Sequence, residues 1–199
     1  SDLDCFTTSF GLASGTELDN TGVYNTDQCS SSCDEPNLDA QYMSAMNQQQ
    51  DILYMVYGTI SEMVTDMASW PDSELPLVVS MSWGLMETKS ETSSLTQACQ
   101  EFAILAGRGV TFFASTGDQG ATNSQPCGTS YNVNFPASCP FVTAVGATTG
   151  YSGETEIVAN APQSVITSGG GFSTIFTTEA GFNLDFQMNQ TNSYRQKIT

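Results

Sequence analysis

The feature that most constrains the fold is an amphipathic helical pattern that leads directly into a strand pattern. In "ETSSLTQACQEFAILAGRG", residues 91–109, apolar side chains recur at helical spacing, and two glycines mark the end of the helix. "VTFFAST", residues 110–116, follows at once as a buried strand, and "LPLVVSMSWG", residues 75–84, predicts another before the helix. Strands that are apolar on both faces and alternate with helices indicate an α/β fold, a parallel sheet with helices on both faces. The helix positions expected to face the sheet are Leu95, Ala98, Cys99, Phe102, Leu105 and Ala106.

The rest of the chain extends this pattern. Asp34 is expected to cap a helix that opens with Glu35 and Pro36, and "DILYMVYG", residues 51–58, predicts a strand. "FPASCPFVTAVGATT", residues 135–149, predicts a further strand after a proline-containing entry. At 199 residues, without an internal repeat, one domain accounts for the chain.

The charge balance excludes several classes of partner. The chain has 21 Asp and Glu against 4 Lys and Arg, a formal net charge of -17 at pH 7. Nucleic acids and anionic membranes are therefore not expected partners. In acid most carboxylates are neutral and few positive charges remain, so charge repulsion stays small and the protein suits low pH.

The chain has no histidine, which removes several kinds of active site. A Ser-His-Asp or Cys-His hydrolase cannot be completed from these residues, and neither can a metal site with histidine ligands. Six cysteines lack any CxxC pair, which favours disulfides over zinc. Cys127 and Cys139 would close a short loop if bonded, while the partners of the other four stay open: Cys5, Cys29, Cys33 and Cys99.

Other features concern the location of the protein. Asn189 begins a glycosylation sequon, and together with the cysteines it favours a secreted or lysosomal/vacuolar protein. The chain has no run of about 18 apolar residues that would span a membrane. "SDLDCFTTSF", at the N-terminus, has neither a basic head nor an apolar core, so we expect that any targeting segment has been removed.

Three carboxylates are candidates for catalysis. Asp118 follows a buried strand in a glycine-flanked loop, where burial would favour its neutral form, which can donate a hydrogen bond to an oxyanion. Carboxyl ends of parallel strands share one edge of the sheet, so Trp83 and Asp118 are expected to face one cleft. Glu35 and Asp39 share a helix face, with Cβ atoms about 6 Å apart, as an acid–base pair would require. Two structural interpretations stay open, namely acidic residues that favour a helix N-terminus and a turn-forming aspartate.

Together these segments resemble the sedolisins, or serine-carboxyl peptidases, which include the tripeptidyl peptidase I type. "EPNLDAQYMSA" is similar to the Glu-x-x-Leu-Asp-x-Gln-Tyr helix of that family, and "GRGVTFFASTGDQG" to its Ser-x-Gly-Asp-x-Gly loop. "VVSMSWG" is similar to the substrate-side strand of the family, and "FPASCPFVTAVGATT" and "SGGGFS" to two further blocks in the right order. The resemblance covers residues from about Phe6 to Phe176 and implies a subtilisin-like fold.

The resemblance implies a role for each carboxylate. Glu35 corresponds to the general base toward a serine nucleophile, Asp39 to the carboxylate that tunes it, and Asp118 to the protonated oxyanion donor. Trp83 corresponds to an aromatic residue beside this network. The residues implied to line the substrate cleft, with Trp83, are Ser82, Gly84, Ser115 and Thr116.

The family's Gly-Thr-Ser-x-Ser nucleophile block and its Asp-rich calcium site are expected outside this chain. Gly128-Thr129-Ser130 lies only ten residues past Asp118, too early to correspond to that block. Residues 1–199 are therefore expected to form the first part of one catalytic domain, inactive alone. A second polypeptide or a missing segment would supply the serine and the calcium ligands, and peptides or proteins would be the substrates. The alternative is a non-catalytic, acidic, disulfide-bonded binding or inhibitory module with the same fold.

Overall fold

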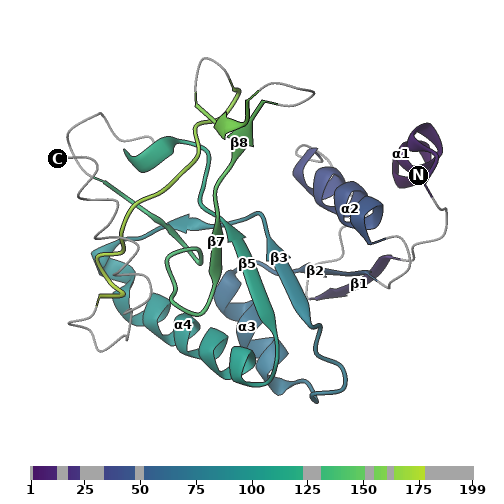
Figure 1. Cartoon of the computed structure of the whole chain (residues 1–199). Helices are drawn as coiled ribbons and strands as arrows, with labels where there is room; N and C mark the ends of the chain where they lie inside the picture. The colour runs from purple at the N-terminus through teal and green to yellow at the C-terminus, as the bar shows by residue number, and fades with distance from the viewer. Residues whose placement is uncertain are drawn as a thin grey trace. The chain divides into compact units, whose positions relative to one another are not determined.

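The structure is a computed structural model that describes residues 2–12, 18–22, 34–47, 52–122, 131–150, 155–160 and 164–177. Contacts within the chain group it into two compact units, Ser1–Pro76 and Leu77–Thr199. Figure 1 shows the helices and strands of both units.

The first unit contains three helices and a two-stranded parallel sheet among its described residues. The helices are α1 (Asp2–Phe10), α2 (Asp34–Met46) and α3 (Ile60–Ser69). β1 (Leu18–Gly22) pairs with β2 (Ile52–Val56), in a register that runs from Leu18 opposite Ile52 to Gly22 opposite Val56. The helix predicted to begin near Asp34 and the strand predicted at residues 51–58 are therefore confirmed, whereas α1 and β1 are found only in the structure.

A capping box begins α3. The Thr59 side chain accepts a hydrogen bond from the Glu62 amide, and the Glu62 carboxylate accepts one from the Thr59 amide, both at 3.1 Å. These bonds satisfy two amides that a helix start would otherwise leave without partners. The helix then buries its apolar side, which carries Met63, Val64 and Met67.

A three-stranded parallel sheet forms the centre of the second unit. β3 (Val78–Met81), β5 (Thr111–Ser115) and β7 (Thr143–Val145) lie in the order β3-β5-β7. The chain passes from β3 to β5 through α4 (Thr92–Gly107), as Figure 1 shows. These elements match the predicted strands and the predicted helix, so the parallel sheet is confirmed.

The core of the second unit lies between α4 and this sheet. Phe102 of α4 meets Phe112 of β5 edge to face, with ring centroids 4.8 Å apart. Burial of each such ring contributes about 1.5–3 kcal/mol to stability. Of the six helix positions predicted to face the sheet, Ala106 is half-buried and the others are buried: Leu95, Ala98, Cys99, Phe102 and Leu105.

The opposite face of this sheet is less covered. Val78 and Val145 are 53% and 48% exposed on the strands β3 and β7. Among the described residues, this face of the sheet is thus only partly covered, which is consistent with the expectation that the sheet is incomplete in this chain.

Short elements complete the described part of the second unit. β4 (Leu85–Met86) pairs antiparallel with β6 (Asn134–Phe135), and β8 (Thr148–Thr149) pairs antiparallel with β9 (Ile157–Val158). Two 3₁₀ turns, η1 (Lys89–Glu91) and η2 (Gly120–Thr122), follow β4 and β5 along the chain.

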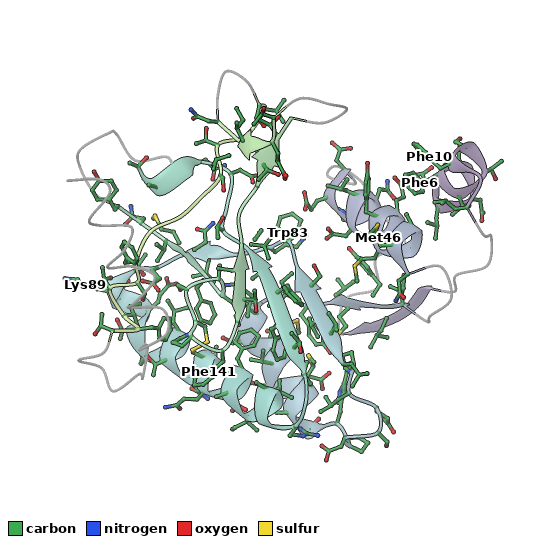
Figure 2. All side chains as sticks on the ribbon, in the orientation of Figure 1. Phe6, Phe10, Met46, Trp83, Lys89 and Phe141 are labelled. Atoms are coloured by element: carbon green, nitrogen blue, oxygen red, sulfur yellow. A yellow bond between two sulfur atoms is a disulfide. The ribbon has the colours of Figure 1, made fainter. Side chains whose placement is uncertain are left out.

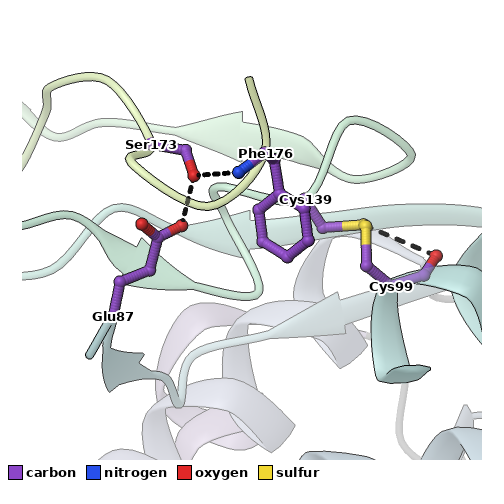
Figure 3. Close-up of a disulfide and its surroundings, with 5 residues drawn as sticks. All are labelled: Glu87, Cys99, Cys139, Ser173 and Phe176. Carbon is purple, nitrogen blue, oxygen red and sulfur yellow. Dashed lines mark hydrogen bonds between the residues drawn. A yellow bond between two sulfur atoms is a disulfide. The ribbon is translucent and has the colours of Figure 1, made fainter. Parts of the chain in front are cut away.

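The structure corrects one predicted disulfide. Cys139 is bonded to Cys99, with Cα atoms 5.6 Å apart, and not to Cys127 (Figure 3). The prediction relied on a short loop, whereas packing places Cys139 against the buried face of α4, where Cys99 lies. Cys5 is an exposed free thiol. Cys29, Cys33, Cys127 and the candidate glycosylation residue Asn189 lie outside the described residues.

In the described part of the chain, none of the helices has the length and apolar character needed to cross a membrane.

Candidate active site

Helix α2 carries two of the three candidate carboxylates. Glu35 and Asp39 lie one helical turn apart and are both half-buried. Asp34 and Glu35 occupy the first turn, where the helix dipole stabilises negative charge, and Pro36 is tolerated there because the first amides have no partner within the helix. The predicted pairing of Glu35 and Asp39 on one helix face thus agrees with the structure.

Tyr54 of β2 lies near this acid pair, and the sequence interpretation missed it. Burial raises the pKa of the Tyr54 phenol, and the negative charges of Asp39 and Glu35 raise it further. A phenol with a raised pKa stays neutral in acid and at neutral pH, so it can donate a hydrogen bond. The only signal in the sequence was a tyrosine in an otherwise apolar strand that follows the acidic helix.

The third carboxylate belongs to the second unit, where the ends of adjacent strands come together. The Ser115 hydroxyl, at the end of β5, donates to the Ser82 carbonyl oxygen just after β3, at 3.2 Å. The amide and the hydroxyl of Thr116 donate to the carbonyl oxygen of Val145, the last residue of β7, at 3.0 and 3.3 Å. The predicted meeting of the β3 and β5 ends is therefore confirmed.

Two of the predicted cleft residues lie just beyond β3. Trp83 is 61% exposed and is labelled in Figure 2. Gly84 is exposed, and a Cβ atom there would lie 2.8 Å from the Phe135 carbonyl oxygen. Trp83 thus presents an aromatic surface to solvent, and any side chain at position 84 would press against β6.

The glycine-rich segment lies along the Asp118 loop. The Thr167 amide donates to the Asp118 carbonyl oxygen at 2.8 Å, and the Gly169 amide donates to the Gly117 carbonyl oxygen at 2.7 Å. The Gly120 amide returns a bond to the Thr167 carbonyl oxygen at 2.9 Å. Two sequence blocks that lie far apart, "STGDQG" and "SGGGFS", are thus paired by backbone hydrogen bonds.

A glycine is required where these two segments are closest. A Cβ atom at Gly169 would lie 1.9 Å from the carbonyl oxygen of Thr116, closer than atoms can approach. Gly117 has a positive φ of 95°, a conformation that residues other than glycine rarely adopt. The turn that leads into Asp118 therefore depends on both glycines.

The Asp118 side chain is exposed. The sequence interpretation expected burial to favour its neutral form, and the described residues do not provide that burial. The bonds between this loop and the glycine-rich segment are backbone bonds, from the Thr167 amide to Asp118 and from the Gly169 amide to Gly117, and they leave the Asp118 side chain exposed. The backbone of Asp118 is thus held by hydrogen bonds, while its side chain is exposed in the described part of the chain.

The calcium site implied by the family resemblance would require several carboxylates close together. In the described ranges, no three or more Cys, Asp or Glu side chains gather closely enough to hold a metal ion. The described residues therefore do not form the calcium site that the family resemblance implies.

Comparisons with known proteins agree with this arrangement. A sequence model of the subtilase family matches residues 24–197. Tripeptidyl-peptidase SED3 of Arthroderma otae is 38% identical over 112 residues, which are 54% of this chain and 18% of the relative. Tripeptidyl-peptidase SED2 of the same fungus is 30% identical over 180 residues, 78% of this chain and 29% of the relative.

A solved structure is also similar. Pseudomonas sedolisin, a serine-carboxyl proteinase complexed with two molecules of pseudo-iodotyrostatin, aligns with a TM-score of 0.65 and 27% identity. The alignment covers 87% of this chain and 53% of that protein. This chain thus spans less than a third of the two fungal relatives and about half of the bacterial one.

The likeness to sedolisin confirms the subtilisin-like fold that the sequence resemblance implies. The match to the family model covers most of the chain, and the candidate residues Glu35, Asp39 and Asp118 fall within it. The chain therefore belongs to the subtilase family, as a member of its sedolisin, or serine-carboxyl peptidase, group.

Proposed function

We propose that this chain is part of a serine-carboxyl peptidase that hydrolyses peptide bonds in acid through an acyl-enzyme. The observation that carries the proposal is the placement of Asp118. Its exposed carboxyl group follows β5 at the carboxyl edge of a parallel sheet, on a loop whose backbone is fixed by the segment 167–169. A donor held in this way can stabilise a developing oxyanion with little rearrangement.

The proposed reaction uses the three carboxylates in turn. Glu35, tuned by Asp39, takes the proton from a serine hydroxyl, and the serine oxygen attacks the peptide carbonyl carbon. Asp118, in its protonated form, donates a hydrogen bond to the oxygen that becomes negative. Glu35 then gives its proton to the leaving amine, and water releases the acyl group by the same steps in reverse.

This proposal ties activity to acid. Asp118 can donate a hydrogen bond to the oxyanion only while its carboxyl group carries a proton, so its proposed role requires acid. The low content of basic residues suits the same conditions, because charge repulsion in acid remains small. We therefore place the protein in an acidic secreted or lysosomal/vacuolar setting.

The substrate is proposed to bind along the ends of β3 and β5. Ser82, Gly84, Ser115 and Thr116 lie at these strand ends, where an extended peptide is proposed to pair with the backbone, and Trp83 offers an exposed aromatic face. The nucleophilic serine and the calcium ligands are proposed to come from polypeptide beyond these 199 residues, either a second chain or a further segment. Calcium would stabilise that remainder structurally, and none of the steps above depends on it.

The first test is a mass spectrum of the native protein under reducing and denaturing conditions. We expect a Gly-Thr-Ser-x-Ser segment, either in a second polypeptide present in equal amount or in a longer form of this chain. Native, folded protein that contains only these 199 residues would favour the non-catalytic binding module.

The second test is Asp118→Ala in the complete protein, assayed on peptides in acid. We expect kcat to fall on the order of 10²-fold or more, because the oxyanion loses its donor. Asp72→Ala is the matched control, since Asp72 is also exposed but lies in the turn after α3. An Asp118→Ala enzyme with unchanged kcat would remove the proposed role.

A further inference from the structure

Glu87 is the buried carboxylate among the described residues, and the proposed reaction does not use it. It follows β4 directly, and its side chain is only 7% exposed. Burial of a charge is costly unless hydrogen-bond donors compensate for the lost water. The contacts of Glu87 therefore indicate what its burial serves.

Both carboxylate oxygens of Glu87 accept hydrogen bonds from one short segment. The Ser173 hydroxyl donates to Oε1 at 2.7 Å (Figure 3). The Thr174 amide donates to Oε2 at 3.2 Å. The Ser173 hydroxyl oxygen also accepts bonds from the Phe176 and Ile175 amides, at 2.8 and 3.0 Å. The single proton of the Ser173 hydroxyl is therefore directed to Glu87. Ser173 and Thr174 both act as donors, so each carboxylate oxygen of Glu87 must accept one hydrogen bond.

The hydrogen bonds among Glu87, Ser173 and Thr174 hold the turn at residues 173–176 against the rest of the second unit. The Phe176 ring is 2% exposed and lies 6.0 Å from the ring of Phe135, centroid to centroid. The Glu87 amide itself donates to the Val133 carbonyl oxygen at 2.9 Å. Glu87 therefore joins three segments, the ends of β4 and β6 and the turn.

The anchored turn continues the segment that holds the Asp118 loop. Gly169, which bonds Gly117, lies only four positions before Ser173, and Thr167, which bonds Asp118, lies two positions earlier still. A movement of the turn would pull on these backbone bonds. The position of Asp118 is thus linked to Glu87 through a short stretch of chain.

We propose that Glu87 is a positioning residue for Asp118, a role that rests on the proposed peptidase function. It acts through Ser173 and Thr174, which fix the glycine-rich segment that in turn fixes the backbone of the Asp118 loop. Glu87 itself touches neither substrate nor reacting atoms.

The test is Glu87→Gln in the complete, active protein. A glutamine has one acceptor oxygen and one donor nitrogen, so it cannot accept both bonds, and one anchor of the turn is lost. We expect kcat to fall roughly 10-fold to 100-fold with KM within about twofold, because a displaced donor weakens transition-state stabilisation more than binding. Glu91→Gln is the matched control, since Glu91 is exposed and its carboxylate also accepts a hydroxyl bond, from Thr88 at 2.7 Å.

A double-mutant cycle separates positioning from general destabilisation. Ser173→Ala removes the hydroxyl partner, so its loss of kcat should not add to that of Glu87→Gln if both act through one contact. Additive losses, or equal losses of kcat in the Glu91→Gln control, would overturn the proposal. Wild-type kcat in Glu87→Gln would also overturn it, provided that Asp118→Ala is inactive. Unchanged kcat in both variants would refute the proposed function itself.

Hydrogen exchange measures the link between Glu87 and the Asp118 loop without depending on activity. If the Glu87→Gln variant folds poorly, the Ser173→Ala variant can be used in its place. We expect exchange at the Thr167 and Gly169 amides to quicken about 10-fold or more, while the amides of Phe112 and Ala114 in β5 stay protected. An equal increase in both places, or none in either, would contradict the link between Glu87 and the Asp118 loop.

Discussion

The two units hold their candidate catalytic residues in different ways. In the first unit, Glu35 and Asp39 are placed on one face by the period of a single helix, four positions apart. In the second unit, Asp118 is placed by Thr167 and Gly169, about fifty positions further along the chain. A helical pair can therefore be recognised from local sequence, whereas a loop fixed by remote backbone cannot.

The comparison predicts that removing long-range links affects stability more than removing short-range ones. The largest effect is expected from the Cys99–Cys139 disulfide, which joins residues 40 positions apart. Replacing both cysteines with alanine should lower the free energy of unfolding of the second unit by about 4 kcal/mol, because the unfolded chain gains freedom. Native-state hydrogen exchange in α4 and β5 measures this change. Cys5→Ala, at an exposed free thiol, should change the free energy of unfolding by less than about 0.5 kcal/mol. An equal effect of both replacements would contradict the prediction that long-range links matter more.

A smaller effect is expected where the glycine-rich segment meets β5. Gly169→Ala would place a Cβ atom 1.9 Å from the Thr116 carbonyl oxygen, so the two backbones must separate. We expect a loss of stability on the order of 2 kcal/mol, measured by urea unfolding. Gly170→Ala is the control, because a Cβ atom there meets nothing within 4 Å. Equal stability of the two variants would show that the segment is not held closely against β5.

The smallest effect is expected for a short-range contact in the first unit. The pKa of Tyr57 is raised to about 12, by burial, by its 2.5 Å hydrogen bond to Asp66 and by the charge of that carboxylate. Since the folded pKa exceeds the ordinary value of 10.0, this contact stabilises the fold below pH 10 and ceases to do so as the pH rises through about 12.

Ultraviolet absorbance of tyrosinate measures that titration. Tyr57→Phe should remove the step near pH 12 and leave the earlier tyrosine titration unchanged. Tyr131→Phe, at a ring that is 74% exposed, serves as the control and should leave the late step in place. If the late step survives in Tyr57→Phe, the phenol is not held by Asp66.

The sequence predicts much of the fold because helix and strand periods are local. The pattern at residues 91–116 predicts α4, β5 and the buried positions of the helix, and the structure confirms them. The disulfide of Cys139 was mispredicted because loop length says nothing about which side chains packing brings together. α1 and β1 lack a clear pattern, and the pairing of β1 with β2 is set by contacts far apart in sequence.

Some parts of the candidate site can likewise be predicted from local sequence, and others cannot. Glu35, Asp39 and Asp118 are recognisable by their motifs, and so are the strand ends that carry Ser82 and Ser115. The partners that surround them are not, because Tyr54 and Glu87 belong to no motif and acquire their surroundings only when distant segments meet. The exposure of Asp118 was missed for the same reason.

The bond between Glu87 and Ser173 has a consequence for the order in which the protein is made. Its two ends lie 86 residues apart, so during translation Glu87 is synthesised 86 residues ahead of its partner Ser173. At about 5–20 residues per second, this interval lasts roughly 4 to 17 seconds. Throughout it the Glu87 carboxylate lacks its partners and the Asp118 loop lacks the segment 167–169, so β3, α4 and β5 can form before the loop acquires its final bonds.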